Sequence, residues 1–193
     1  MKNLTEITAI VRAYLDDSAA VVTQPILDTI NHLSNLFSID SIDSSQSTVV
    51  GEITLDFPSE CLEVDTVFVD GDEVRKLKSL DDLQTAESLN AQRWYEFGGK
   101  IQFVEVFTAI KTAKIFYKKG FKEPEAGTDT DVPLKLMELV YVGAQYRYYN
   151  LLLSKLVLNK SELPDIKPDE LRTIRDDVKK NFFDLVKQIK INE

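Results

Sequence analysis

Residues 132–158 constrain this chain most, because their apolar side chains point to nearly every side of one predicted helix of about seven turns. Three rows at helical spacing are Leu136, Val140, Gly143 and Arg147; Leu139, Val142, Tyr146, Tyr149, Leu153 and Leu156; and Met137, Tyr141, Ala144, Tyr148 and Leu152. A helix with one wet face needs only one apolar stripe. Two interpretations stay open: the central helix of a small bundle, or a helix that also contacts another subunit.

Charge excludes several classes of protein. Residues such as Lys135, Glu138 and Arg147 leave no window of about 18 uncharged apolar residues, so a membrane span is not expected. The 193 residues include 23 Lys and Arg against 32 Asp and Glu, a net charge of −9. This balance argues against wrapping DNA or lying on an anionic membrane, since both need concentrated positive charge.

The beginning of the chain and its single cysteine indicate the compartment. The first residues, Met1 to Glu6, contain no apolar signal core, and Cys61 has no second cysteine for an internal disulfide. We therefore expect a protein made and working, or assembled, inside a cell.

The chain is predicted to have three parts. Residues 1–47 contain one helix ending near Asp16, a second with Thr23 as N-cap and Pro25 in its first turn, and then a flexible link over 38–47. Residues 48–121 form an antiparallel β domain of five or six short strands. Its first strand ends at Pro58, and its hairpin turns are Asp70-Gly71 and Gly98-Gly99.

Residues 122–193 are predicted to be helical again. Asp131 is expected to cap the long helix, and a final helix is expected to be capped near Asp169. A short helix is expected over Leu80 to Leu89 within the β domain. The fold class is therefore α+β: a helical bundle, completed by the C-terminal helices, with an inserted small antiparallel β domain.

The sequence offers no residue pattern that would support catalysis. His32 is the only histidine and has no neighbour that would orient it, and His32 with Cys61 is too small a set for a zinc site. Asp70-Gly71-Asp72-Glu73 lacks the ligand spacing of a calcium loop, and the chain lacks phosphate-binding glycine motifs. We expect no catalytic, cofactor-binding or metal-binding residue, although a carboxylate pair for glycoside chemistry stays open.

The order of the parts resembles the head-to-tail adaptor proteins of tailed bacteriophages, which are connector or neck ring proteins of the tail-tubular or nozzle-adaptor type. The segments that carry the resemblance are residues 57–71 (a Pro-led strand ending at a hairpin), 94–103, 115–119, the acidic loop, and 132–144. The resemblance covers most of the chain and concerns element order and residue class.

The resemblance implies a non-enzymatic virion protein at the neck, between the capsid portal and the tail. It implies a homo-oligomeric ring, usually a dodecamer, that contacts the portal protein and downstream tail or nozzle proteins, with DNA only as passing cargo. The ring-interface candidates are Tyr141, Tyr148 and Tyr149. The portal-docking candidates are Phe182, Phe183, Val186 and Ile189.

Other interpretations remain. The apolar stripe of the final helix is most simply explained by core packing against the long helix, with a docking surface for another protein as the alternative. A phage tail-completion or stopper protein would share this composition, and an unrecognised ligand-binding domain or enzyme with a carboxylate site is a third possibility.

Overall fold

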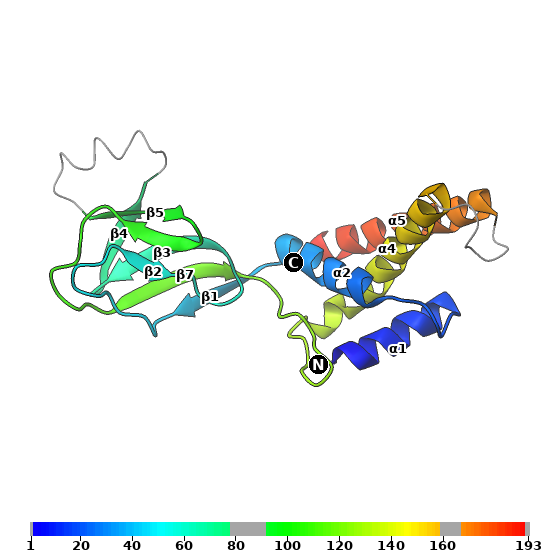
Figure 1. Cartoon of the computed structure of the whole chain (residues 1–193), viewed down its shortest axis with the longest axis horizontal. Helices are drawn as coiled ribbons and strands as arrows, with labels where there is room; N and C mark the ends of the chain where they lie inside the picture. The colour runs from blue at the N-terminus through cyan, green and yellow to red at the C-terminus, as the bar shows by residue number, and fades with distance from the viewer. Residues whose placement is uncertain (1, 78–91, 159–166, 192–193) are drawn as a thin grey trace. The chain divides into compact units, whose positions relative to one another are not determined.

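The computed structural model describes residues 2–77, 92–158 and 167–191, which form two units (Figure 1). Unit 1 contains residues 1–36 and 121–193, and unit 2 contains residues 37–120. In sequence, unit 2 is therefore inserted between two helical segments of unit 1. The fold is α+β, which confirms the predicted class.

Unit 1 is helical, and its helices pack around one of their number. The elements are α1 (Leu4–Leu15), α2 (Thr23–Leu36), the 3₁₀ turn η1 (Leu134–Leu136), α4 (Met137–Leu158) and α5 (Pro168–Ile191). Within the described residues α4 contacts α1, α2 and α5. The side chains of Leu139, Val140 and Ala144 are fully buried there. The first half of α4 is thus the centre of a helical core.

The ends of α1 and α2 follow local side-chain chemistry. Asn3 and Glu6 form a reciprocal capping box at the start of α1, and Asp16 ends it in the left-handed conformation with φ 51°. The end near Asp16 is confirmed. Helix α2 begins one residue earlier than predicted, because the Val22 carbonyl accepts the first helical hydrogen bond from Ile26 N–H.

The start of α4 differs from the prediction of a helix over 132–158. The 3₁₀ turn η1 precedes α4, with Leu136 N–H donating to Pro133 O at 2.8 Å. Asp131 does not cap this helix, because its carboxylate accepts from Lys122 N–H at 2.5 Å and so closes the preceding loop. Another contact of this loop is Phe121 N–H donating to Ser34 Oγ of α2.

Unit 2 is a curled seven-stranded sheet with the order β1-β7-β3-β4-β5-β6-β2. Its strands are β1 (Ile39–Asp43), β2 (Thr54–Asp56), β3 (Cys61–Val69), β4 (Asp72–Lys76), β5 (Arg93–Phe97), β6 (Lys100–Phe103) and β7 (Ala113–Lys119). The sheet is mixed and not purely antiparallel as predicted, because β4 and β5 pair in parallel. Residues 77–92 provide the long connection that a parallel pair requires. The helix predicted over Leu80 to Leu89 lies outside the described residues.

Both predicted hairpin turns are confirmed. Asp70 and Gly71 have φ values of 53° and 91°, and Gly98 and Gly99 have φ values of 59° and 74°. Positive φ at both central residues matches the right-handed twist of the flanking strands, so these dipeptides set the register of β3 with β4 and of β5 with β6.

The segment predicted as a flexible link contains strand β1, so that prediction is wrong. Its residues pair with β7 at the sheet edge, with Ile42 opposite Phe116 and Asp40 opposite Lys118. The carboxylate of Asp40 also forms an ion pair with Lys118 Nζ. Long-range pairing therefore orders a polar segment whose local sequence favours a loop.

The core of unit 2 lies on one face of the sheet. Trp94 is fully buried, and its Nε1–H donates to Val74 O at 2.8 Å. The other large buried side chains are Leu55, Val64, Val67, Val69, Val74, Ile101, Phe103, Phe107, Ile115 and Tyr117. The opposite face, which we call the outer face, carries Phe68, Phe116 and charged residues.

Candidate interaction surfaces

The ring-interface candidates lie on α4 and differ in exposure. Tyr141 is buried within unit 1, where its ring stands 6.0 Å from that of Tyr14. Tyr148 and Tyr149 are half-buried, and their rings are 5.9 Å apart. Tyr148 also donates its hydroxyl hydrogen bond to Asp17 at 3.2 Å. Burial raises the pKa of the Tyr148 hydroxyl, and the charge of Asp17 raises it further.

The second half of α4 is as apolar as the first but is not fully covered. Leu151 is 46% exposed, and the other apolar residues of this half with described side chains are half-buried. They are Tyr146, Tyr148, Tyr149, Leu152, Leu153 and Leu156. We call this set, with Leu151, the α4 surface. Apolar side chains gathered on one exposed helix segment are typical of a protein contact.

The portal-docking candidates on α5 also differ in exposure. Phe182 is 2% exposed, its ring lies 6.1 Å from that of His32, and Val186 is buried as well. Both residues belong to the helical core, so neither has a surface to offer a partner. Ile189 is half-buried. Phe183 is 43% exposed. Of the two phenylalanine candidates, only Phe183 is therefore accessible to a partner, and its docking on the portal stays a prediction.

Phe183 lies among lysines on an exposed flank of α5. Lys179, Lys180, Lys187 and Lys190 are four, three, four and seven residues away, spacings that place all of them on the side of the helix that carries Phe183. All four lysines are exposed. We call these four lysines with Phe183 the basic face.

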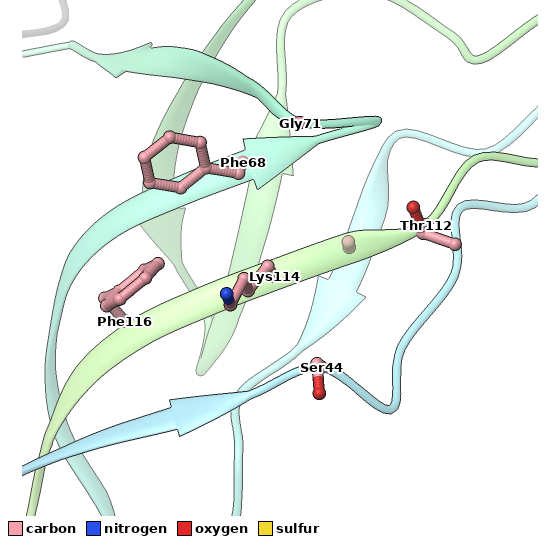
Figure 2. Close-up of a pocket in the computed structure, with 7 residues that line it drawn as sticks. Ser44, Phe68, Gly71, Thr112, Lys114 and Phe116 are labelled. Atoms are coloured by element: carbon pink, nitrogen blue, oxygen red, sulfur yellow. The ribbon is translucent and has the colours of Figure 1, made fainter.

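The outer face of unit 2 carries an aromatic pair that the sequence analysis missed. The rings of Phe68 on β3 and Phe116 on β7 are 5.5 Å apart, and Lys114 Nζ lies 5.4 Å from the centroid of the Phe116 ring. Figure 2 shows both rings and Lys114 on the same side of the sheet. These residues line a hollow of about 560 Å³. Strand alternation could have placed each Phe opposite the core, but only the β3–β7 register brings the two together.

A second hollow on the same face is acidic. It has a volume of about 620 Å³ and shares the Phe68 and Phe116 rings with the first. Its other lining residues are Asp40, Ser41, Ile42, Asp65, Thr66, Glu73, Tyr117 and Lys118. We call this hollow the acidic groove.

The electrostatics of the acidic groove are dominated by carboxylates. The hydrogen bond from Lys118 to Asp40 raises the pKa of Lys118, and the charges of Asp65 and Glu63 raise it further. After the Asp40–Lys118 pair, Asp65 and Glu73 have no salt-bridge partner in the described part of the chain. The lining of the groove therefore combines two phenylalanine rings with three carboxylates and one lysine.

A third surface consists of two loops held together by backbone hydrogen bonds. Val49 and Val50 lie in a turn and are about half exposed, beside a loop that contains Val106 and Ile110. The loops are joined by bonds such as Gly51 N–H to Phe107 O at 2.9 Å and Phe107 N–H to Glu52 O at 3.1 Å.

The described residues contain no cluster of three or more His, Cys, Asp or Glu side chains that could hold a metal ion. Burial lowers the pKa of His32, and the nearby Arg147 charge lowers it further. Burial raises the pKa of the Cys61 thiol to about 11, with Glu96 adding to the shift. A thiol with so high a pKa is a poor nucleophile at neutral pH.

Comparison of the chain with protein-family models and with curated proteins finds no match. Over the described ranges, none of the helices combines the length and apolar character needed to span a bilayer. The function of the chain is therefore inferred from its surfaces.

Proposed function

We propose that this protein is a structural virion protein, a head-to-tail adaptor whose copies form a ring between the portal and the tail. The observation that carries the proposal is the α4 surface: seven apolar residues on one helix segment that the chain's own helices leave partly exposed. A helical bundle interrupted in sequence by a small β domain is the architecture that the family resemblance implies.

The α4 surface fits a contact between subunits. Tyr148, Tyr149 and Leu151 provide large rigid or branched side chains, and burying such groups contributes most of the free energy of stable association. In this proposal the ring is a homo-oligomer, with a dodecamer as the implied stoichiometry. The portal protein and downstream tail or nozzle proteins are its partners, and the virion neck is its location.

The net charge of −9 suits a ring through which the packaged genome passes. Negative charge on the channel wall would repel the phosphate backbone, so DNA would slide as cargo and would not bind. The proposed role is non-enzymatic and needs no cofactor.

The direct test is mass measurement of the purified protein alone and with portal protein. We expect a multimer of defined stoichiometry in the presence of portal, and class averages in the electron microscope should show a ring at the portal vertex. A protein that stays monomeric in both conditions and binds no portal would contradict the proposal. A ring that binds the tail tube but not the portal would favour a tail-completion or stopper protein.

The variant Leu151→Ser/Leu152→Ser tests the α4 surface. These positions are partly exposed, so we expect the circular dichroism spectrum to be preserved while ring formation is lost. The matched control is Val21→Ser, because Val21 is 75% exposed and lies outside α4. Ring assembly that survives the double substitution would remove the α4 surface from the interface.

A further inference from the structure

The distribution of charge along this chain is uneven, and it separates two surfaces. Unit 2 contains fifteen acidic and nine basic residues, so it carries −6 of the net −9. Residues 179–190 of α5 contain four lysines and one acid, a balance of +3. An acidic protein therefore presents one strongly basic helix segment, and that segment has an exposed aromatic residue at its centre.

The positive charge of the basic face lies on exposed lysine side chains. Lys179, Lys180 and Lys187 form no ion pair with any residue in the described ranges. Asp184 lies four residues after Lys180 and three before Lys187, so its carboxylate is on the same side of α5, and Asp176 forms an ion pair with Arg175 at 2.6 Å. With Asp184 counted, residues 179–190 of α5 still carry a net charge of +3.

The acidic groove on the outer face of unit 2 has the opposite character. Phe68 and Phe116 line it, Ile42 contributes an exposed apolar side chain, and Asp65 and Glu73 provide carboxylates that form no ion pair within the described residues. Its volume of about 620 Å³ is in the range of sites that accommodate a group much larger than one aromatic ring. An aromatic side chain beside two aromatic rings gains from edge or offset contacts.

We propose that the basic face of one copy docks into the acidic groove of a second copy of this chain, with Phe183 beside Phe68 and Phe116. Lys180 and Lys187 then face Asp65 and Glu73, and the two surfaces match in both charge and aromatic character. This inference rests on the proposed ring assembly and assigns two of its contact surfaces.

The geometry of such a contact is head-to-tail, because each copy contributes a different surface. A copy that has docked its basic face still has a vacant acidic groove, so further copies can add, and the assembly is a ring where the rotation between neighbours closes and an open filament where it does not. An isologous dimer, by contrast, would use the same patch on both subunits and would stop at two copies.

The test uses two full-length variants, each lacking one surface. Variant A is Phe183→Ser/Lys180→Glu/Lys187→Glu, and variant B is Asp65→Lys/Glu73→Lys. Both change exposed side chains, and circular dichroism checks the fold of each. The control for variant A is Phe97→Ser/Lys111→Glu/Lys122→Glu, which makes the same changes of residue type in loops and a hairpin outside both surfaces. The control for variant B is Asp129→Lys/Glu170→Lys.

Sedimentation equilibrium over a range of protein concentration gives the outcome. We expect the wild type and both controls to self-associate beyond a dimer, more weakly at high salt, since salt screens the charges. Variants A and B alone should be monomeric. Mixed together they should form a 1:1 dimer and nothing larger, because only one intact basic face and one intact acidic groove remain.

Several results overturn the inference. If the wild type stays monomeric up to its solubility limit, the docking of the basic face into the acidic groove is overturned. Binding to portal protein would in that case still leave the proposed function standing. Variants A and B that associate like the wild type also overturn it and leave the ring to the α4 surface. If variant A self-associates normally but no longer binds portal protein, the basic face belongs to the portal contact. If a mixture of variants A and B stays monomeric, the basic face and the acidic groove do not bind each other.

Discussion

Gly143 of α4 lies directly against Thr29 of α2: a Cβ atom built on Gly143 would stand 2.5 Å from Thr29 Cγ2. The same Cβ would stand 2.9 Å from Cε2 of Phe182 on α5. Helices α2, α4 and α5 therefore pack against one another at Gly143, which has no side chain. Thr29 is fixed there because its hydroxyl donates to Pro25 O at 2.7 Å.

We expect Gly143→Ala to destabilise unit 1 by about 1–3 kcal/mol, although alanine favours helix, because overpacking at this crossing outweighs the gain in helix propensity. Chemical denaturation followed by circular dichroism measures the change in free energy of unfolding. Adding Thr29→Ser removes the clashing methyl group and keeps the hydroxyl, so it should recover part of the loss. An equal or higher stability of Gly143→Ala would show that the helices separate without cost. Ser154→Ala, at an exposed position of α4, is the control.

Trp94→Phe tests the core of unit 2. The substitution leaves the Val74 carbonyl without its indole donor in the core and removes the contact of Lys76 Nζ, 4.8 Å from the Trp94 ring centroid. The lost buried hydrogen bond and the cavity left by the smaller ring together cost about 1–3 kcal/mol. We expect a loss of at least this size in the free energy of unfolding, measured by circular dichroism because the only tryptophan is removed. Tyr95→Phe, a half-buried neighbour, should change stability little.

The lowered pKa of His32 predicts that the protein loses stability on mild acidification. Its folded-state pKa lies below the ordinary value of 6.5, so the unfolded chain binds the proton more tightly. The contribution of neutral His32 to the free energy of unfolding is therefore fully present above pH 6.5, and it is lost as the pH falls through the folded-state pKa. The wild-type melting temperature should decrease more between pH 7 and pH 5.5 than that of His32→Gln. Parallel decreases in the two proteins would show that His32 is not linked to folding.

The Cys61 thiol should react slowly with alkylating reagents. A pKa of about 11, against an ordinary value of 9.0, reduces the thiolate fraction near pH 8 about 100-fold. We expect alkylation at pH 8 to be slower than that of an exposed cysteine by a factor of this order and to accelerate up to about pH 11. The comparison protein is Ser154→Cys in a Cys61→Ala background, which places one exposed thiol on α4. Equal rates for the two thiols at pH 8 would contradict the expected shift.

Local sequence rules predicted the features that depend on adjacent residues. Asp70-Gly71 and Gly98-Gly99 gave the two hairpins because these dipeptides tolerate positive φ, and the spacing of apolar residues gave α1, α2, α4 and α5. The same rules failed for β1 and for the parallel pairing of β4 with β5. Both depend on which distant strand is adjacent, and local periodicity contains no information about that.

The candidate surfaces divide in the same way. Periodicity identified Phe182, Phe183 and Val186 as one apolar stripe but could not say which of them faces the core. The difference between Phe182 at 2% exposed and Phe183 at 43% arises from the crossing of α5 over Gly143 and Thr29. The acidic groove required the β3–β7 register before Phe68 and Phe116 became neighbours.

By itself, the sequence determined the α+β class, the hairpin turns, the excess of negative charge and a long helix that needs partners on several sides. The class, the turns and the helix follow from conformational preferences of residues a few positions apart. The negative charge is a residue count over the whole chain. Only the tertiary structure decided which half of α4 is covered, which phenylalanine of α5 is exposed and where Phe68 meets Phe116. Each of these depends on contacts between residues far apart in sequence, whose geometry is set when helices cross and strands pair.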